Sequence, residues 1–92
     1  MNKKELISAV RNKTGEKRYQ VEASVNAALD IITSTITSGG IVTISGFGSF
    51  SVKERAARIG YNPAAGEKID IPETRTPVFK AGKGLRDAVN NK

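Results

Sequence analysis

The chain has 92 residues, no cysteine, no histidine and a formal net charge of +6. Thiolates and imidazoles are the commonest zinc ligands, and imidazole is the commonest general base. We therefore expect no enzyme, no metal site, no cofactor and no small-molecule substrate. A domain of this length buries only a modest core, so we expect a second chain to complete it. The sequence contains no membrane span and no signal-peptide pattern, and we expect a cytoplasmic protein.

Positive charge is concentrated at the two ends of the chain. Residues 1–18 carry six basic and two acidic side chains, and residues 75–92 carry five and one. Residues 19–52 contain no Lys or Arg, whereas residues 53–74 carry four side chains of each sign. A middle without basic residues suits a buried core or interface, and basic ends suit a polyanion. The alternative is that the excess of Lys and Arg only keeps a small protein soluble.

Two helices are predicted in the N-terminal part. Asn2 and Glu5 have the spacing of a capping box, which predicts a first helix from about Lys3 to Lys13 that ends at Gly15. A longer helix is predicted from position 16 or 17 to the glycines at 39 and 40. Its apolar side chains recur at helical spacing and comprise Val21, Val25, Ala28, Leu29, Ile32 and Ile36.

A sheet is predicted after these glycines, because the apolar pattern changes from helical to alternating. Residues 41–45 are short and β-branched, the glycines at 46 and 48 suit a turn, and residues 49–53 alternate between polar and apolar. A return strand over residues 68–71 and a strand over residues 78–80 follow. Pro72 and Pro77 suit an edge or a bulge. This region contains three aromatic residues, Phe47, Phe50 and Phe79. Their rings are either core side chains or platforms on which bases stack, and we interpret them as core.

The stretch from residue 53 to residue 75 is predicted to be a projecting hairpin, which we call the arm. It has too few large apolar side chains for a core of its own, so a partner must order it. Its basic side chains suit the phosphates of a narrow groove. The alternative is a solvated hairpin whose basic groups pair with nearby acids, namely Glu54, Glu67, Asp70 and Glu73.

Two further features suit contact with DNA. Pro63 follows Asn62 at the predicted tip, where a proline is either a turn residue or a wedge between base steps. The last helix begins after Gly82 without a side-chain cap, so its first N–H groups are available to an anion beside Lys83 and Arg86. Lys3 and Lys4 stand in a similar position at the start of the first helix.

Taken together, these motifs resemble the bacterial histone-like HU/IHF family of DNA-binding proteins over nearly the whole chain. The motifs are ISGFGSF at 44–50, ERAAR at 54–58, Gly60, Asn62-Pro63 and PVFKAGK at 77–83. The resemblance implies an α+β fold in which two chains intertwine. Each chain would have a helical base, a three-stranded antiparallel sheet, a protruding β-ribbon arm and a short C-terminal helix.

The resemblance also implies a role for each part of a single domain over residues 1–92. Residues 1–40 would dimerise, residues 41–82 would form the sheet with the arm at 53–75, and residues 83–92 would form the last helix. Pro63 would intercalate. The arm would contact the minor groove through Lys53, Arg55, Arg58, Tyr61, Asn62, Pro63, Lys68 and Arg75. Phosphate contacts on the flanks would come from Lys3, Lys80, Lys83 and Arg86. The dimer core would contain Leu29, Ile32, Ile36, Ile44, Phe47, Phe50 and Phe79.

Three positions and one loop depart from the pattern of the family. Tyr61 stands where a basic residue is common, Ala65 where Thr is frequent, and Ala81 where Pro is frequent. The loop before the second helix has Glu16-Lys17 in place of an apolar residue and an N-cap. Loss of a charge at position 61 should weaken phosphate contact, while the Tyr61 ring adds apolar contact near the tip.

We therefore expect a nucleoid-associated architectural protein that binds double-stranded DNA with little sequence preference and bends it. The expected assembly is a homodimer, with a heterodimer also possible. Two alternatives remain open. One is a sequence-selective subunit similar to IHF, and the other is a general polyanion module that binds RNA or acidic proteins.

Overall fold

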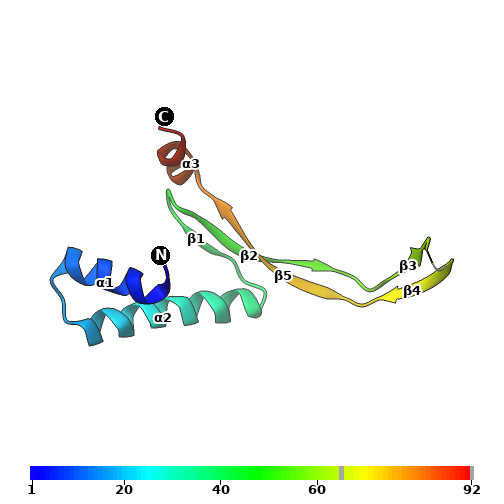
Figure 1. The fold of residues 1–92 in the computed structure, drawn as a ribbon, viewed down its shortest axis with the longest axis horizontal. Coiled ribbons are helices and arrows are strands. Elements are labelled where there is room, and N and C mark those ends of the chain that lie inside the picture. The colour runs from blue at the N-terminus through cyan, green and yellow to red at the C-terminus, as the bar shows by residue number, and fades with distance from the viewer. Residues whose placement is uncertain (65, 92) are drawn as a thin grey trace. The chain divides into compact units, whose positions relative to one another are not determined.

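The computed structural model describes residues 1–64 and 66–91, in which three helices and five strands follow one another along the chain (Figure 1). Ala65 and Lys92 lie outside the described residues. The helices are α1 (Lys3–Thr14), α2 (Arg18–Thr37) and α3 (Lys83–Asn90). The strands are β1 (Val42–Ile44), β2 (Gly48–Arg55), β3 (Arg58–Asn62), β4 (Glu67–Ile71) and β5 (Thr74–Ala81). These elements confirm the predicted α+β class.

The chain divides into two compact units, residues 1–34 and residues 35–92, with the division inside α2. In the first unit the helix hairpin buries Ile7 and Val21, which are 3% and 1% exposed. The N-cap of α1 is as predicted, because the Glu5 N–H donates to Asn2 Oδ1 at 2.8 Å. Gly15 ends the helix with φ 73°, and its N–H donates to the carbonyl of Arg11. Only glycine adopts this left-handed conformation without strain.

The start of α2 corrects the sequence prediction, because the helix begins at Arg18 instead of position 16 or 17. The carbonyl of Lys17 accepts the N–H of Val21 at 3.1 Å. The side chain of Gln20 reaches back, and its Oε1 accepts the Lys17 N–H at 3.3 Å. Gln20 therefore supplies half of a capping box, and the missing N-cap side chain explains why no local pattern marks this boundary.

The second unit contains a three-stranded antiparallel sheet in the order β1-β2-β5. Pro77 lies on the edge strand β5, opposite Val52, which confirms the expected edge position. The strands β2 and β5 are longer than the alternating pattern predicted, since their pairing continues to Arg55 and Thr74. Backbone hydrogen bonding sustains this part of the ladder after the apolar pattern has ended, and the side chains that it carries are exposed.

Backbone contacts attach α3 to the turn between β1 and β2. The Gly82 N–H donates to the carbonyl of Phe47 at 2.8 Å, and the Leu85 N–H donates to the carbonyl of Gly46 at 3.0 Å. A Cβ atom at Gly84 would lie 2.5 Å from the Gly46 carbonyl oxygen. Only a glycine at position 84 permits this approach. Gly82 and Gly84 therefore hold the start of α3, and with it the basic residues Lys83 and Arg86, against the β1–β2 turn.

Candidate nucleic-acid interface

Strands β3 and β4 form a two-stranded antiparallel ribbon, which is the outer part of the arm (Figure 1). The ladder between β2 and β5 ends at the pair Arg55 and Thr74, and that between β3 and β4 begins at the pair Arg58 and Ile71. Pro72 lies in this gap and has no N–H to donate. β2 therefore runs into the arm as far as Arg55, and the strand pairing of the arm is interrupted between Arg55 and Arg58.

Asn62 closes the turn at the tip of the arm. Its carbonyl accepts the Gly66 N–H at 2.8 Å, and its side-chain Oδ1 accepts the Ala64 N–H at 3.0 Å. Gly66 has φ 68°, a conformation that favours glycine. Asn62 thus has a structural role in the turn besides the DNA contact that the resemblance implied. Pro63 lies in the turn that these bonds define.

The two faces of the ribbon differ in chemistry, because directly opposite residues point to the same face. On one face Ile71 lies close over Gly60, where an added Cβ would be 2.5 Å from Ile71 Cδ1. The other face carries Ile59 and Tyr61, which are 70% and 65% exposed. Tyr61 is directly opposite Lys68. Ile59 is directly opposite Asp70, so this second face offers apolar surface with one cation and one acid beside it.

Most basic residues of the arm form no ion pair within the described part of the chain. One ion pair forms among residues 1–64 and 66–91, and it joins Arg75 Nε to Glu54 Oε1 at 3.3 Å. Arg75 Nη2 also donates to the carbonyl of Thr37 at 2.9 Å. Arg75 was predicted to contact DNA, but its side chain already has partners within the protein at the base of the arm. The other basic side chains of the arm make no ion pair with a described residue, namely Lys53, Arg55, Arg58 and Lys68.

This pattern weighs against the solvated-hairpin alternative. That alternative needs the acids of the arm to neutralise its basic groups. Among the described residues, Glu54 alone does so, and it pairs with Arg75 on the returning strand. The outgoing Arg55 and Arg58 keep their full charge for an external anion.

The flank residues of the second unit gather around the start of α3. Lys80 and Arg86 line one hollow together with the β1–β2 turn and Gly82. Gly82 is the N-cap and supplies no side-chain hydrogen bond, as predicted. Lys83 is the first residue of the helix. The Leu85 N–H is already bonded to the Gly46 carbonyl, so the cations lie beside the other N–H groups of the first turn, and these suit a phosphate.

The predicted core aromatics contact one another in the sheet. The Phe79 ring centroid lies 4.8 Å from that of Phe50 and 5.6 Å from that of Phe47. Phe47 and Phe79 are nevertheless 45% and 43% exposed. Ile44 and Leu29 are also exposed, and Ile32 and Ile36 are half-buried.

One polar contact has no signal in the sequence. In the first unit Arg18 Nη1 donates to Ser8 Oγ at 3.2 Å. The two residues are ten positions apart and meet only because the helix hairpin folds, so no local pattern indicates them. The described residues contain no cluster of three or more potential metal ligands and no helix that could cross a membrane.

Comparison with known proteins places these features in a family. The family model described as "Bacterial DNA-binding protein" matches residues 1–90. The chain is 50% identical over 92 residues to the SPbeta prophage-derived DNA-binding protein HU 2 of Bacillus subtilis (strain 168), with all of both chains covered. It is 47% identical over 89 residues to the DNA-binding protein HU of Geobacillus stearothermophilus, covering 97% of this chain and 99% of the relative.

Solved structures agree with this result. The chain in a cocrystal structure of Anabaena HU with DNA has a TM-score of 0.84 and 47% sequence identity, with all of both chains covered. HU from Thermotoga maritima has a TM-score of 0.69 and 34% identity, covering 97% of this chain and 98% of that one. The similarity therefore extends over the helices, the sheet and the arm.

Proposed function

The chain belongs to the family of bacterial DNA-binding proteins that includes the HU proteins, and from this premise we propose that its dimer bends duplex DNA with little sequence preference. Membership of this family confirms the prediction of a DNA-binding protein that is not an enzyme. The observation that carries the bending mechanism is the arm, in which arginines without an ion pair among the described residues lead to a proline at the tip. We place this activity on the bacterial nucleoid, in the cytoplasm.

In this mechanism the arm enters the minor groove, and Pro63 inserts between two base steps. The ring of proline is rigid, compact and free of an N–H that would need a partner between the bases. Unstacking costs a few kcal/mol for each step, and the bend brings more DNA against the protein. The Asn62 turn supports the wedge, because two hydrogen bonds to Asn62 hold the backbone around Pro63.

Phosphate neutralisation supplies most of the affinity in this proposal. Lys53, Arg55, Arg58 and Lys68 make these contacts on the arm. On the flanks, the contacts come from Lys80, Lys83 and Arg86 near the start of α3, and from Lys3 at the start of α1. Each contact releases condensed counterions, so affinity falls as salt rises, with a slope of about −0.9 per phosphate in a double-logarithmic plot.

Dimerisation follows from how little apolar surface one chain buries. Among the described residues, Ile7 and Val21 are the buried apolar side chains. The half-exposed Phe47 and Phe79 would lose their remaining water contact in a dimer core with Ile44 and Leu29. Burial of apolar surface yields roughly 25 cal/mol per Å², so covering these side chains with a second copy of the chain is favourable. We propose that residues 1–40 and the aromatic side chains of the sheet dimerise.

Fluorescence transfer between dyes at the two ends of one duplex tests the bending. We expect bound protein to raise the transfer efficiency on intact DNA and to raise it further on nicked or gapped DNA, where unstacking costs less. Pro63→Ala should keep binding but reduce the bend. Unchanged transfer with Pro63→Ala would refute the wedge.

Competition experiments separate this function from its alternatives. If one defined site outcompetes random duplex by several orders of magnitude, the protein is selective in the manner of IHF. If duplex RNA binds as tightly as duplex DNA, the protein is a general polyanion module. We expect neither result.

A further inference from the structure

Arg75 connects three elements of the second unit through one guanidinium. The residue itself lies on β5. Its Nε meets Glu54 Oε1 of β2 at 3.3 Å, and its Nη2 donates to the carbonyl of Thr37 at 2.9 Å. Thr37 is the last residue of α2 and lies in the same unit as both strands. The side chain of Arg75 therefore joins the base of the arm to the end of this helix.

The carbonyl of Thr37 lies at a helix end, where polar groups need partners from outside the helix. The last four carbonyls of a helix find no N–H within it, and the helix dipole favours a cation beside them. The last turn of α2, all of which the structure describes, contains no basic residue. Arg75 lies 38 positions later in the chain and supplies both the donor and the charge.

The two bonds of Arg75 differ in how firmly they hold the arm. The side chains of Arg75 and Glu54 are 43% and 61% exposed, and an exposed ion pair between two mobile side chains adds little stability. The carbonyl of Thr37 belongs to the backbone of a helix, so it offers a fixed acceptor. A hydrogen bond from a charged donor is also stronger than one between neutral groups. The bond to Thr37 is therefore the anchor, and Glu54 orients the guanidinium toward it.

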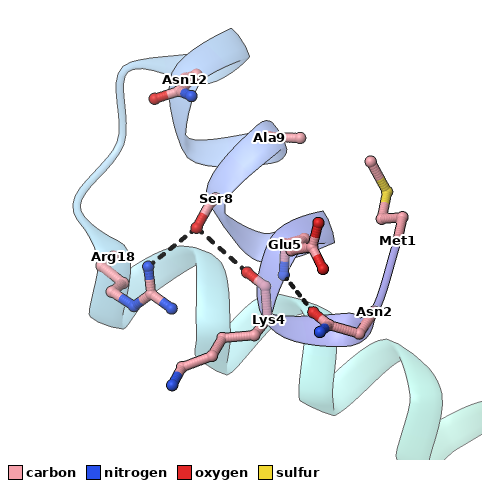
Figure 2. A pocket seen from close by; sticks show the side chains of 8 residues that line it. All are labelled: Met1, Asn2, Lys4, Glu5, Ser8, Ala9, Asn12 and Arg18. Carbon is pink, nitrogen blue, oxygen red and sulfur yellow. Dashed lines mark hydrogen bonds between the residues drawn. The ribbon is translucent and has the colours of Figure 1, made fainter.

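This bridge depends on the shape of the arginine side chain. A guanidinium carries five N–H donors on three nitrogens in one plane, whereas the ammonium of lysine is a single nitrogen. In the first unit Arg18 makes a simpler contact, because its Nη1 donates to Ser8 Oγ within the helix hairpin (Figure 2). Arg75 reaches two partners on two different elements through two different nitrogens. A lysine at position 75 would keep the charge but could not occupy both positions.

The bridge lies where the sheet becomes the arm. The pairing of β1 with β2 reaches Phe50, so the ladder beyond that point consists of β2 and β5. Glu54 and Arg75 form the pair next to the outer end of this ladder, and the next ladder begins at Arg58. A two-stranded ribbon is marginally stable by itself and twists more than a wider sheet does. A bond from its outer end to a helix therefore limits how far the ribbon can swing.

We propose that Arg75 is a positioning residue that sets the direction in which the arm leaves the sheet, and that it does not contact phosphate. The inference rests on the proposed function, because the direction of the arm matters for bending. A bend requires the wedge at Pro63 and the cations at the start of α3 to contact one duplex together. An arm whose base swings could hold DNA without drawing it toward these cations. The bridge therefore couples binding by the arm to bending.

Fluorescence transfer along an end-labelled duplex, at saturating protein, tests this role. Arg75→Gln removes the bridge and the charge, and Arg75→Lys removes the bridge alone. We expect both variants to lose transfer efficiency, while the salt slope of affinity changes by much less than the value of about 0.9 for one phosphate contact. Glu54→Gln keeps an acceptor oxygen and the bond to Thr37, so it should keep the bend. Lys13→Gln removes an exposed cation of α1 and is the control that should change neither quantity.

Amide hydrogen exchange on the protein without DNA tests the bridge directly. We expect Arg75→Gln and Arg75→Lys to speed exchange several-fold at the outer end of the ladder, in residues 53–55 and 74–76, because local opening becomes easier there. Exchange in residues 48–50, at the other end of β2, should stay as in the wild type. Thermal melting of each variant checks that it is folded at the temperature of the measurement.

Two results would overturn the proposal. Wild-type transfer efficiency for both Arg75→Gln and Arg75→Lys would show that the bridge does not set the direction of the arm. A salt slope reduced by about 0.9 in Arg75→Gln, with slope and bend both recovered in Arg75→Lys, would make Arg75 a phosphate contact instead.

Failure of the proposed function gives a different result. In that case the wild-type protein itself would not raise the transfer efficiency, and the role of Arg75 in bending would fail with it. The exchange experiment needs no DNA, so it would still decide whether Arg75 holds the base of the arm. Unchanged exchange in both variants would show that it does not.

Discussion

Glu54 and Arg75 face each other across β2 and β5 and form an ion pair, with Oε1 and Nε 3.3 Å apart. Arg75 also bonds the carbonyl of Thr37 through Nη2, so it links the end of α2 to the base of the arm. Arg55 is the next residue along β2 and has no such partner among the described residues. Two arginines of the arm therefore have different electrostatic roles.

The first prediction compares these two arginines. Arg55→Gln should reduce the salt slope of DNA binding by about 0.9, because it removes an available charge. Arg75→Gln should change the slope much less, since Glu54 already neutralises Arg75. It should lower stability by less than about 1 kcal/mol, as is usual for an exposed pair. Salt titrations with one duplex and thermal unfolding measure both effects. Equal slopes for the two variants would show that the Glu54 pair does not matter for binding.

The second prediction concerns Tyr61 on the exposed face of the ribbon. Tyr61→Arg should make the salt slope steeper by about 0.9, because it adds a cation near the proposed wedge. Tyr61→Phe keeps the ring and should leave the slope unchanged. Affinity on gapped DNA should fall with Tyr61→Ala, since base–aromatic contact is worth about 1–3 kcal/mol. If Tyr61→Ala binds gapped DNA as wild type does, the ring makes no contact.

The third prediction concerns Gly84 in α3. Alanine normally stabilises a helix by about 1 kcal/mol relative to glycine. Here the added Cβ would lie 2.5 Å from the carbonyl oxygen of Gly46, a backbone atom that cannot move aside easily. We expect Gly84→Ala to destabilise the protein by about 1–3 kcal/mol. Val89→Ala, on an exposed site of the same helix, is the control and should be nearly neutral. A stabilised Gly84→Ala protein in chemical unfolding would contradict the docking of α3.

The fourth prediction tests the dimer through Phe79. The Phe79 ring is 43% exposed in one chain. If the protein is a monomer, removing this ring should therefore destabilise it by less than removing a fully buried ring would. If a second chain covers it, Phe79→Ala should cost about 3–5 kcal/mol per site. Denaturant unfolding at several protein concentrations measures this, because the midpoint of a dimer rises with concentration. Val89→Ala, at an exposed position on α3 outside the proposed dimer contact, is the control. A midpoint independent of concentration would contradict dimerisation.

The sequence by itself determined the features that depend on local chemistry. The Asn2 cap, the Gly15 stop and the uncapped start of α3 were all predicted, because each involves residues within one turn of one another. The change from helical to alternating apolar spacing located the sheet. The arm was found because its composition cannot form a core, and its Asn62-Pro63 turn has few other conformations.

Only the tertiary structure decided the features that join distant residues. Arg75, one of the cations expected to contact DNA from the arm, is paired with Glu54 in the structure. The hydrogen bond between Arg18 and Ser8 joins two helices, and no motif indicates it. The length of β2 and its break before Arg58 depend on hydrogen bonding to a partner strand. In each case the free energy of the contact comes from a residue far away in the chain, so only folding brings it within reach of its partner.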